Sequence, residues 1–83
     1  IMFSIMLIKL SPRNEIAPNV QKLLTEYGCI IKTRLGLHEA TIDNCSRSGL
    51  IILDLLNEDT DKILELENKL NELKGVSAKI VEV

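Results

Sequence analysis

The single histidine of this 83-residue sequence, His38, is where metal or acid–base chemistry would most simply be built. Asp43 and Cys45 follow it within seven positions, so one loop could bring three metal-ligating side chains together. Zinc sites use several histidines or clustered cysteines, and this sequence has one histidine, two cysteines and no C-x-x-C pattern. We therefore predict no metal ion and no other cofactor, and we interpret His38 as a solvated loop residue.

The two cysteines, Cys29 and Cys45, offer little redox chemistry. Lys32 and Arg47 are the only nearby cations that would favour a thiolate. Cys29 precedes two isoleucines, so we interpret it as a small core side chain. Two cysteines do not make a disulfide framework, and a reduced, cytoplasmic setting is expected.

Catalytic motifs are missing from the sequence. It has no G-x-S-x-G pattern and no glycine-rich phosphate loop, and one histidine leaves no set of nucleophile, base and acid. We predict that the protein is not an enzyme.

Two groups of polar residues could bind a small anion. Asn14 and Glu15, after Arg13, stand at an expected helix N-terminus, whose free N–H groups attract anions. Lys32 and Arg34 share one strand face and could hold a carboxylate or phosphate. Alternatively, Asn14 is only a helix cap, and the strand charges only protect an edge strand from aggregation. The candidate ligand-binding residues are Asn14, Glu15 and Arg34.

Length and composition set limits on partners. Eighty-three residues allow one domain, spanning 1–83. The net charge is −2 and aromatic residues make up 2 %, so no basic or base-stacking surface for nucleic acid is expected. The apolar start, 1–10, is too short for a membrane span and lacks the basic segment of a signal peptide. No membrane partner is predicted.

Hydropathy periodicity predicts the elements that must position the candidate residues. Four strands are expected over 3–10, 29–38, 49–56 and 76–83, with a polar loop over 39–48. A helix is expected between the first two strands, with Pro18 in its first turn and Gly28 as a left-handed stop. A second helix is expected to start among the capping residues 57–61 and to end at Gly75.

The element order β-α-β-β-α-β predicts an α+β, ferredoxin-like fold: a four-stranded antiparallel sheet with two helices on one face. Its first and third strands are central, and here those two are apolar on both faces. The edge strands carry charged residues, which agrees with that topology.

Two helices can cover only one face of such a sheet, so one apolar set of the central strands must face outward. That set includes Ile8 and Leu53 in one parity, or Ile5 and Ile52 in the other. An open apolar face usually marks an interface. We predict a homodimer, or a dimer of dimers, through the helix-free sheet face.

Particular motifs also resemble a known family. The segment 16–31 is similar to the first helix and second strand of ACT domains, which are small ferredoxin-like regulatory modules that bind amino acids or other ligands between subunits. The run 24–37, with Tyr27-Gly28 at the helix end and Arg34-Leu35-Gly36 late in the strand, resembles the stand-alone ACT-like regulators of the iron-only hydrogenase system, as do the segments 48–55 and 73–77. The fold also resembles the ligand domain of nickel-responsive repressors, whose metal site needs several histidines.

The resemblance implies a small regulatory or ligand-sensing domain, with any ligand pocket at the subunit boundary near Asn14, Glu15 and Arg34. Amino-acid-binding ACT domains usually carry glycine in the loop before the first helix, and the matching segment 13–16 has none. The alternative is a structural or protein-interaction subunit without a small-molecule ligand.

Overall fold

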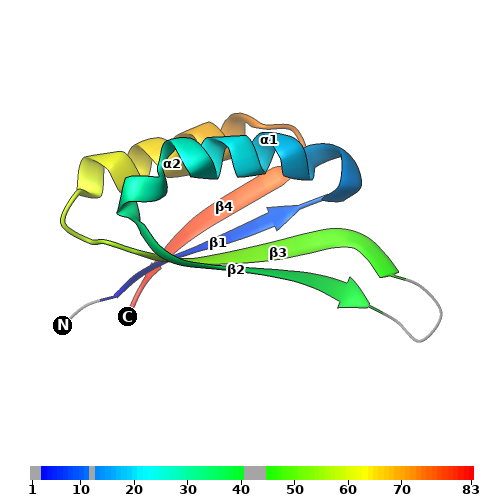
Figure 1. Ribbon diagram of the computed structural model, residues 1–83, viewed down its shortest axis with the longest axis horizontal. Coiled ribbons are helices and arrows are strands. Elements are labelled where there is room, and N and C mark those ends of the chain that lie inside the picture. The colour runs from blue at the N-terminus through cyan, green and yellow to red at the C-terminus, as the bar shows by residue number, and fades with distance from the viewer. Residues whose placement is uncertain (1–2, 12, 41–44) are drawn as a thin grey trace.

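The computed structural model describes residues 3–11, 13–40 and 45–83, with side chains for 3–11, 15–36 and 48–83. Its elements are β1 (Ser4–Leu10), α1 (Arg13–Glu26), the short 3-10 helix η1 (Gly28–Ile30), β2 (Ile31–Ala40), β3 (Cys45–Leu55), α2 (Thr60–Glu72) and β4 (Val76–Glu82). The strands form one antiparallel sheet in the order β2-β3-β1-β4, and both helices lie on one face (Figure 1). The ferredoxin-like prediction, with the first and third strands central, is confirmed. Within these residues, no helix is long and apolar enough to cross a membrane.

The core lies between the helices and the sheet and uses one parity of each central strand. Successive strand side chains point to opposite faces, so the helices cover alternate residues only. The buried side chains include Met6, Ile8, Leu10, Ile51, Leu53 and Leu55 from the strands and Val20, Leu24, Ile63, Leu66 and Leu70 from the helices. Ile8 and Leu53 therefore face the helices, and the outward parity is that of Ile5 and Ile52.

Helix α1 starts earlier than the sequence indicates. It begins at Arg13, which places Asn14 inside the helix and Pro18 at its sixth position, beyond the first turn. Pro18 has no N–H, so α1 lacks one internal hydrogen bond. The helix persists because burial of Val20 and Leu24 against the sheet holds it in place.

The connection from α1 to β2 also differs from the prediction. Gly28 is not a left-handed stop: it begins η1, and among the described residues only Gly75 has a positive φ. Cys29 is exposed within η1, so its interpretation as a core side chain is wrong. Ile30 is the buried residue of this turn instead.

The hairpin between β2 and β3 is longer than expected. Ala40 pairs with Cys45, so strand pairing continues into the predicted polar loop 39–48. Backbone hydrogen bonds do not depend on side-chain polarity, so a ladder started by apolar residues can continue through polar ones. Residues 41–44 lie outside the described part of the chain.

One side-chain cluster joins the two helices. The Tyr27 hydroxyl donates a 2.7 Å hydrogen bond to Glu65 Oε1, and the ammonium groups of Lys62 and Lys69 lie 3.7 and 3.6 Å from the same carboxylate. The hydrogen bond from Tyr27, followed by the charges of Lys62 and Lys69, lowers the pKa of Glu65. The end of α1 is thus attached to α2 through an ionised carboxylate.

Replacing Tyr27 with phenylalanine is expected to raise the pKa of Glu65 toward its ordinary value, because the main cause of its lowering is removed. A lowered pKa in the folded state stabilises the protein at neutral pH, and this stabilisation is lost as the pH falls below about 4.3. The difference in the free energy of unfolding between wild type and Tyr27→Phe should therefore become smaller as the pH is lowered. An NMR titration of the Glu65 carboxyl carbon measures the shift; identical titration in both proteins would contradict it.

Candidate functional site

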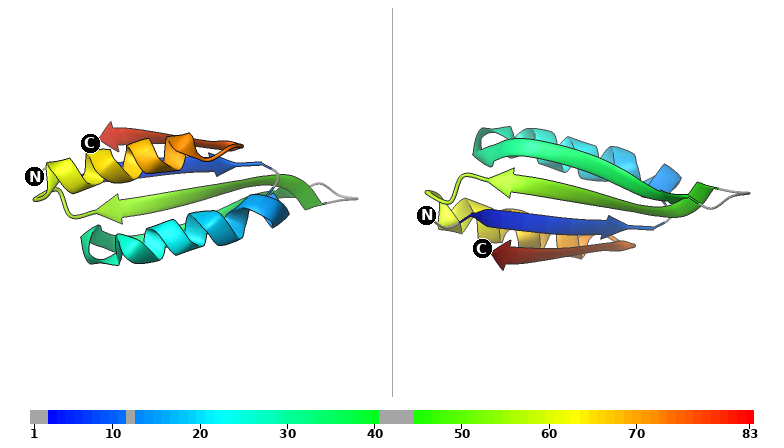
Figure 2. Two further views of the ribbon diagram at one scale, coloured as in Figure 1. Left: turned by 90° about the horizontal axis from the view of Figure 1, so that it is seen from above. Right: turned by 90° about the horizontal axis from the view of Figure 1, so that it is seen from below.

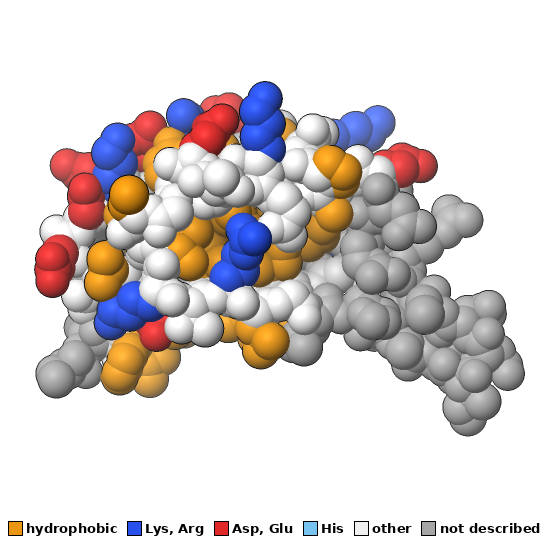
Figure 3. All heavy atoms as spheres, in the orientation of Figure 1, with side chains coloured by type: hydrophobic (Ala, Val, Ile, Leu, Met, Phe, Trp, Pro, Cys, Tyr) orange, Lys and Arg blue, Asp and Glu red, His pale blue; other side chains and the backbone are white. Residues whose placement is uncertain are grey.

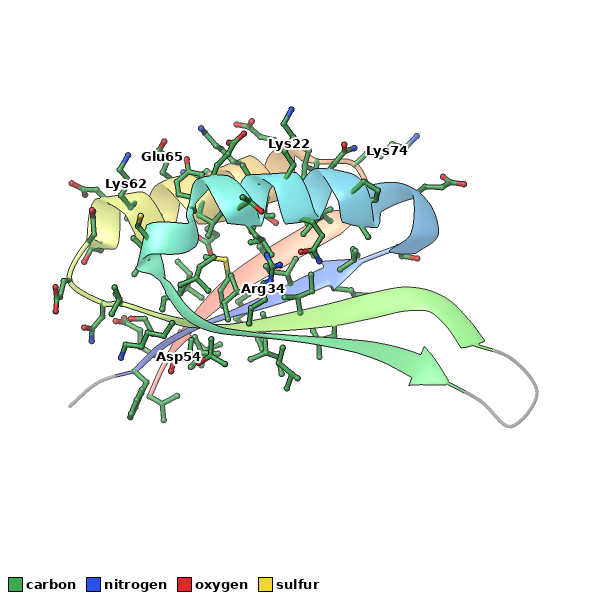
Figure 4. All side chains as sticks on the ribbon, in the orientation of Figure 1. Lys22, Arg34, Asp54, Lys62, Glu65 and Lys74 are labelled. Atoms are coloured by element: carbon green, nitrogen blue, oxygen red, sulfur yellow. The ribbon has the colours of Figure 1, made fainter. Side chains whose placement is uncertain are left out.

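Arg34 is the candidate ligand residue whose side chain the structure places most clearly. It lies in the edge strand β2 and pairs with Leu53 of β3. Paired residues point to the same face, and Leu53 is buried under the helices, so Arg34 extends toward α1 (Figure 4). Its side chain is exposed and, in the described part of the chain, forms no hydrogen bond or ion pair.

Arg34 extends across a hollow between α1 and β2. Helix α1 packs on β1 and β3, which leaves the helix side of the edge strand β2 less covered. Figure 3, in the same orientation as Figure 4, shows hydrophobic side chains in this hollow with a cationic side chain in front of them. An unpaired guanidinium beside apolar surface suits a ligand with an apolar body and a carboxylate or phosphate. We call this hollow the Arg34 groove.

Glu15 occupies a different place. It lies in the first turn of α1 and lines an open cleft of about 570 Å³ with Ser11, Asn19, Lys74 and others. Arg34 does not line this cleft, and within the described residues no interaction joins Glu15 to Arg34. Asn14 is the second residue of α1, and its side chain lies outside the described part. A ligand role for Asn14 and Glu15 stays a prediction.

The three residues considered for a metal site cannot be compared as side chains. His38 lies in β2, where its backbone pairs with Gly49, so its interpretation as a loop residue is wrong. Cys45 pairs with Ala40. The side chains of His38 and Cys45, and all of Asp43, lie outside the described residues. Among the side chains that are described, no group of three His, Cys, Asp or Glu residues could hold a metal ion.

No helix covers the sheet face opposite α1 and α2 (Figure 2, right). The register puts Ile5, Leu7, Leu50 and Ile52 of the central strands together, with Leu35 of β2 and Val81 of β4 at their sides. Phe3 and Val83 exchange backbone hydrogen bonds and extend the same face. Leu35, Phe3 and Val83 are 51, 49 and 75 % exposed. We call these eight residues the helix-free face.

Sequence reasoning missed Asp54. It pairs with Ile5 on one side and Thr33 on the other, which places it on the helix-free face among apolar residues (Figure 4). Its Oδ1 atom is shielded from solvent and has no hydrogen-bond partner in the part of the chain that the structure describes. The available signal was one acidic residue inside the apolar run 50–56, since aspartate is disfavoured in strands.

Solved structures share this architecture. The uncharacterized protein TM1266 from Thermotoga maritima matches with a TM-score of 0.80 and 28 % identity, over 98 % of this chain and 95 % of that one. CPII, a nitrogen regulatory PII-like protein from Thiomonas intermedia K12, matches with a TM-score of 0.67 and 15 % identity, over 100 % and 91 %. The ACT domain from GTP pyrophosphokinase of Chlorobium tepidum matches with a TM-score of 0.66 and 18 % identity, over 96 % of each chain. The chain has the ACT-like and PII-like ferredoxin fold.

No protein-family model and no curated protein sequence matches the chain. The similarity of this chain to known proteins therefore rests on the shared ACT-like fold and on the match to TM1266. Within that fold, two features belong to this chain's own residues: the Arg34 guanidinium, which has no partner among the described residues, and the apolar helix-free face.

Proposed function

We propose that this chain is a small regulatory, ligand-sensing domain in which Arg34 binds the anionic group of a small-molecule effector. The carrying observation is the exposed guanidinium of Arg34, unpaired within the described residues, in the groove between α1 and β2. The fold supports this class of function: CPII, which shares it, was solved with ADP, AMP and bicarbonate bound. All three of those molecules are anions, the charge that an arginine recognises. The proposal assigns no catalytic step to the chain.

A ligand that binds at Arg34 should raise the melting temperature, and Arg34→Gln should abolish that rise. A ligand at 100 times its Kd stabilises the folded state by about 2.7 kcal/mol, which is a shift of roughly 10 °C or more for a domain of this size. Thermal shift with AMP, ADP, bicarbonate and the amino acids is the measurement. Lys74→Gln is the matched control, because Lys74 lines the cleft at Glu15 instead. Loss of the shift in Lys74→Gln alone would move the site to that cleft.

We further propose that the system this chain regulates is the iron-only hydrogenase system. The motifs Tyr27-Gly28 and Arg34-Leu35-Gly36 support a regulator of the iron-only hydrogenase system, acting in the cytoplasm. Co-purification of the tagged chain from its native host, with mass analysis of the bound proteins, tests this assignment. Recovery of hydrogenase-system proteins by wild type but not by the Arg34→Gln variant would support this assignment. Their absence from both samples would contradict it.

The assembly belongs to the same proposal. The chain forms a homodimer, or a dimer of dimers, because the helix-free face leaves eight apolar side chains uncovered at the side of the sheet that no helix reaches. The second candidate function, a structural or protein-interaction subunit without a small ligand, is favoured by the same surface. A thermal shift that depends on Arg34 separates the two, since only the ligand-sensing domain requires it.

A further inference from the structure

We infer that Asp54 is the recognition residue of the homodimer: it forms an ion pair across the interface with a lysine of a second copy. The inference rests on the proposed assembly through the helix-free face and names the polar contact that orients it. The observation behind it is the Oδ1 atom of Asp54, which is shielded from solvent and has no hydrogen-bond partner among the described residues.

A carboxylate oxygen without a partner is costly in apolar surroundings. Asp54 stands between Ile52 in its own strand and Ile5 in the paired strand β1. Removing a charge from water without compensation costs several kcal/mol, so buried charges in proteins are almost always paired. If a second apolar face covered Asp54 and supplied no cation, the interface would be opposed by this residue. The partner must therefore bring a positive group.

The same face carries the required cations. Lys9 and Lys79 lie on it by register, since Lys9 pairs with Leu50 and Lys79 with Leu7. The Lys32 ammonium lies 5.8 Å from the centre of the Phe3 ring and so points to this face as well. None of the three makes an ion pair within the described residues, where Asp54 is the only acidic side chain on this face. One central acid and three peripheral lysines make the face complementary to a second copy of itself.

Two-fold symmetry doubles the contact. In a symmetric dimer each residue contact occurs twice, so two identical Asp54–lysine pairs form. If the axis runs along the strands between β1 and β3, Lys79 of one copy lies about 8 Å to the side of Asp54 of the other, given the spacing of strands and residues. If the axis runs across the strands, Lys9 takes that place. Apolar contacts alone would not favour one direction of the symmetry axis over the other, whereas a buried ion pair favours the direction that brings a lysine to Asp54.

The test is charge exchange, read by dimer dissociation constants from analytical ultracentrifugation. Asp54→Asn and Asp54→Leu should each weaken the dimer by about 30-fold or more, the range for breaking a buried charge pair. Asp54→Lys should be monomeric, and one second substitution, Lys79→Asp, Lys9→Asp or Lys32→Asp, should restore the dimer. Circular dichroism melts confirm that each variant folds. Asp54→Asn preserves side-chain shape if the leucine or lysine variant fails to fold.

Each result decides the question. A dimer that tightens or stays unchanged in Asp54→Leu, or that no lysine exchange restores, overturns the inference and leaves the proposed homodimer standing. A monomeric wild type overturns the homodimer, and the inference with it. Restoration by one lysine alone supports the inference; restoration by Lys79→Asp identifies an axis along the strands, and restoration by Lys9→Asp an axis across them.

Discussion

Replacing Ile5 and Ile52 with lysine is expected to convert the protein from a dimer into a monomer. Both side chains lie half-buried at the centre of the helix-free face, on neighbouring strands. The two substitutions place four ammonium groups in a symmetric interface, and an unpaired buried charge costs about 3–5 kcal/mol. The dissociation constant should therefore rise by more than about 1,000-fold. In the monomer, lysine stems can lie along the apolar surface with their charges in water, so the fold should persist.

Light scattering at micromolar concentration measures this effect. Wild type should have about twice the chain mass of 9.3 kDa, and the double variant should have the mass of one chain. Leu64→Lys is the matched control, because Leu64 is also an exposed hydrophobic residue, at 46 %, but lies on α2. The control should stay dimeric. A wild-type mass near 9.3 kDa, or a dimeric double variant, would refute the assembly.

Gly75→Ala should be one of the most destabilising single substitutions in this chain. Gly75 has a φ of 82°, a conformation that costs an L-residue about 1–2 kcal/mol. An added Cβ would also meet the Ser11 carbonyl oxygen and the Ile16 side chain. Ser11 cannot move away freely, because its N–H donates a 2.9 Å hydrogen bond to the Gly75 carbonyl. We expect the free energy of unfolding to fall by about 2–4 kcal/mol, which corresponds to a melting temperature lower by about 10 °C or more.

Gly28→Ala is the control for that substitution. Gly28 begins η1 without a positive φ, and nothing lies within 4 Å of an added Cβ. Its replacement should change stability by less than about 1 kcal/mol, in either direction. Thermal melts of the two variants give the comparison. Equal losses of stability in the two variants would contradict the special role of the positive φ and the crowding at Gly75.

The order of the elements and the identity of the two central strands could be predicted from the residues alone. The strands over 3–10 and 49–56 carry apolar side chains on both faces. Such strands are typical of the centre of a sheet, where a neighbouring strand lies on each side and at least one face is buried. The start of the second helix could also be predicted from the sequence. Asp59 accepts a 3.1 Å hydrogen bond from the Lys62 N–H at its start, as the capping residues indicate, because capping is a contact between close neighbours in sequence.

Which face each central strand turns to the helices could not be predicted in this way, because it depends on helix packing. Ile5 and Ile8 are chemically equivalent, so nothing local distinguishes the two parities. The choice depends on how α1 and α2 pack, which buries Ile8 completely and leaves Ile5 outward. Glu15 lines a cleft that Arg34 does not line, although sequence reasoning places both near one pocket. The shielding of the Asp54 Oδ1 atom, and its lack of a partner among the described residues, are likewise properties of the surroundings and not of the residue.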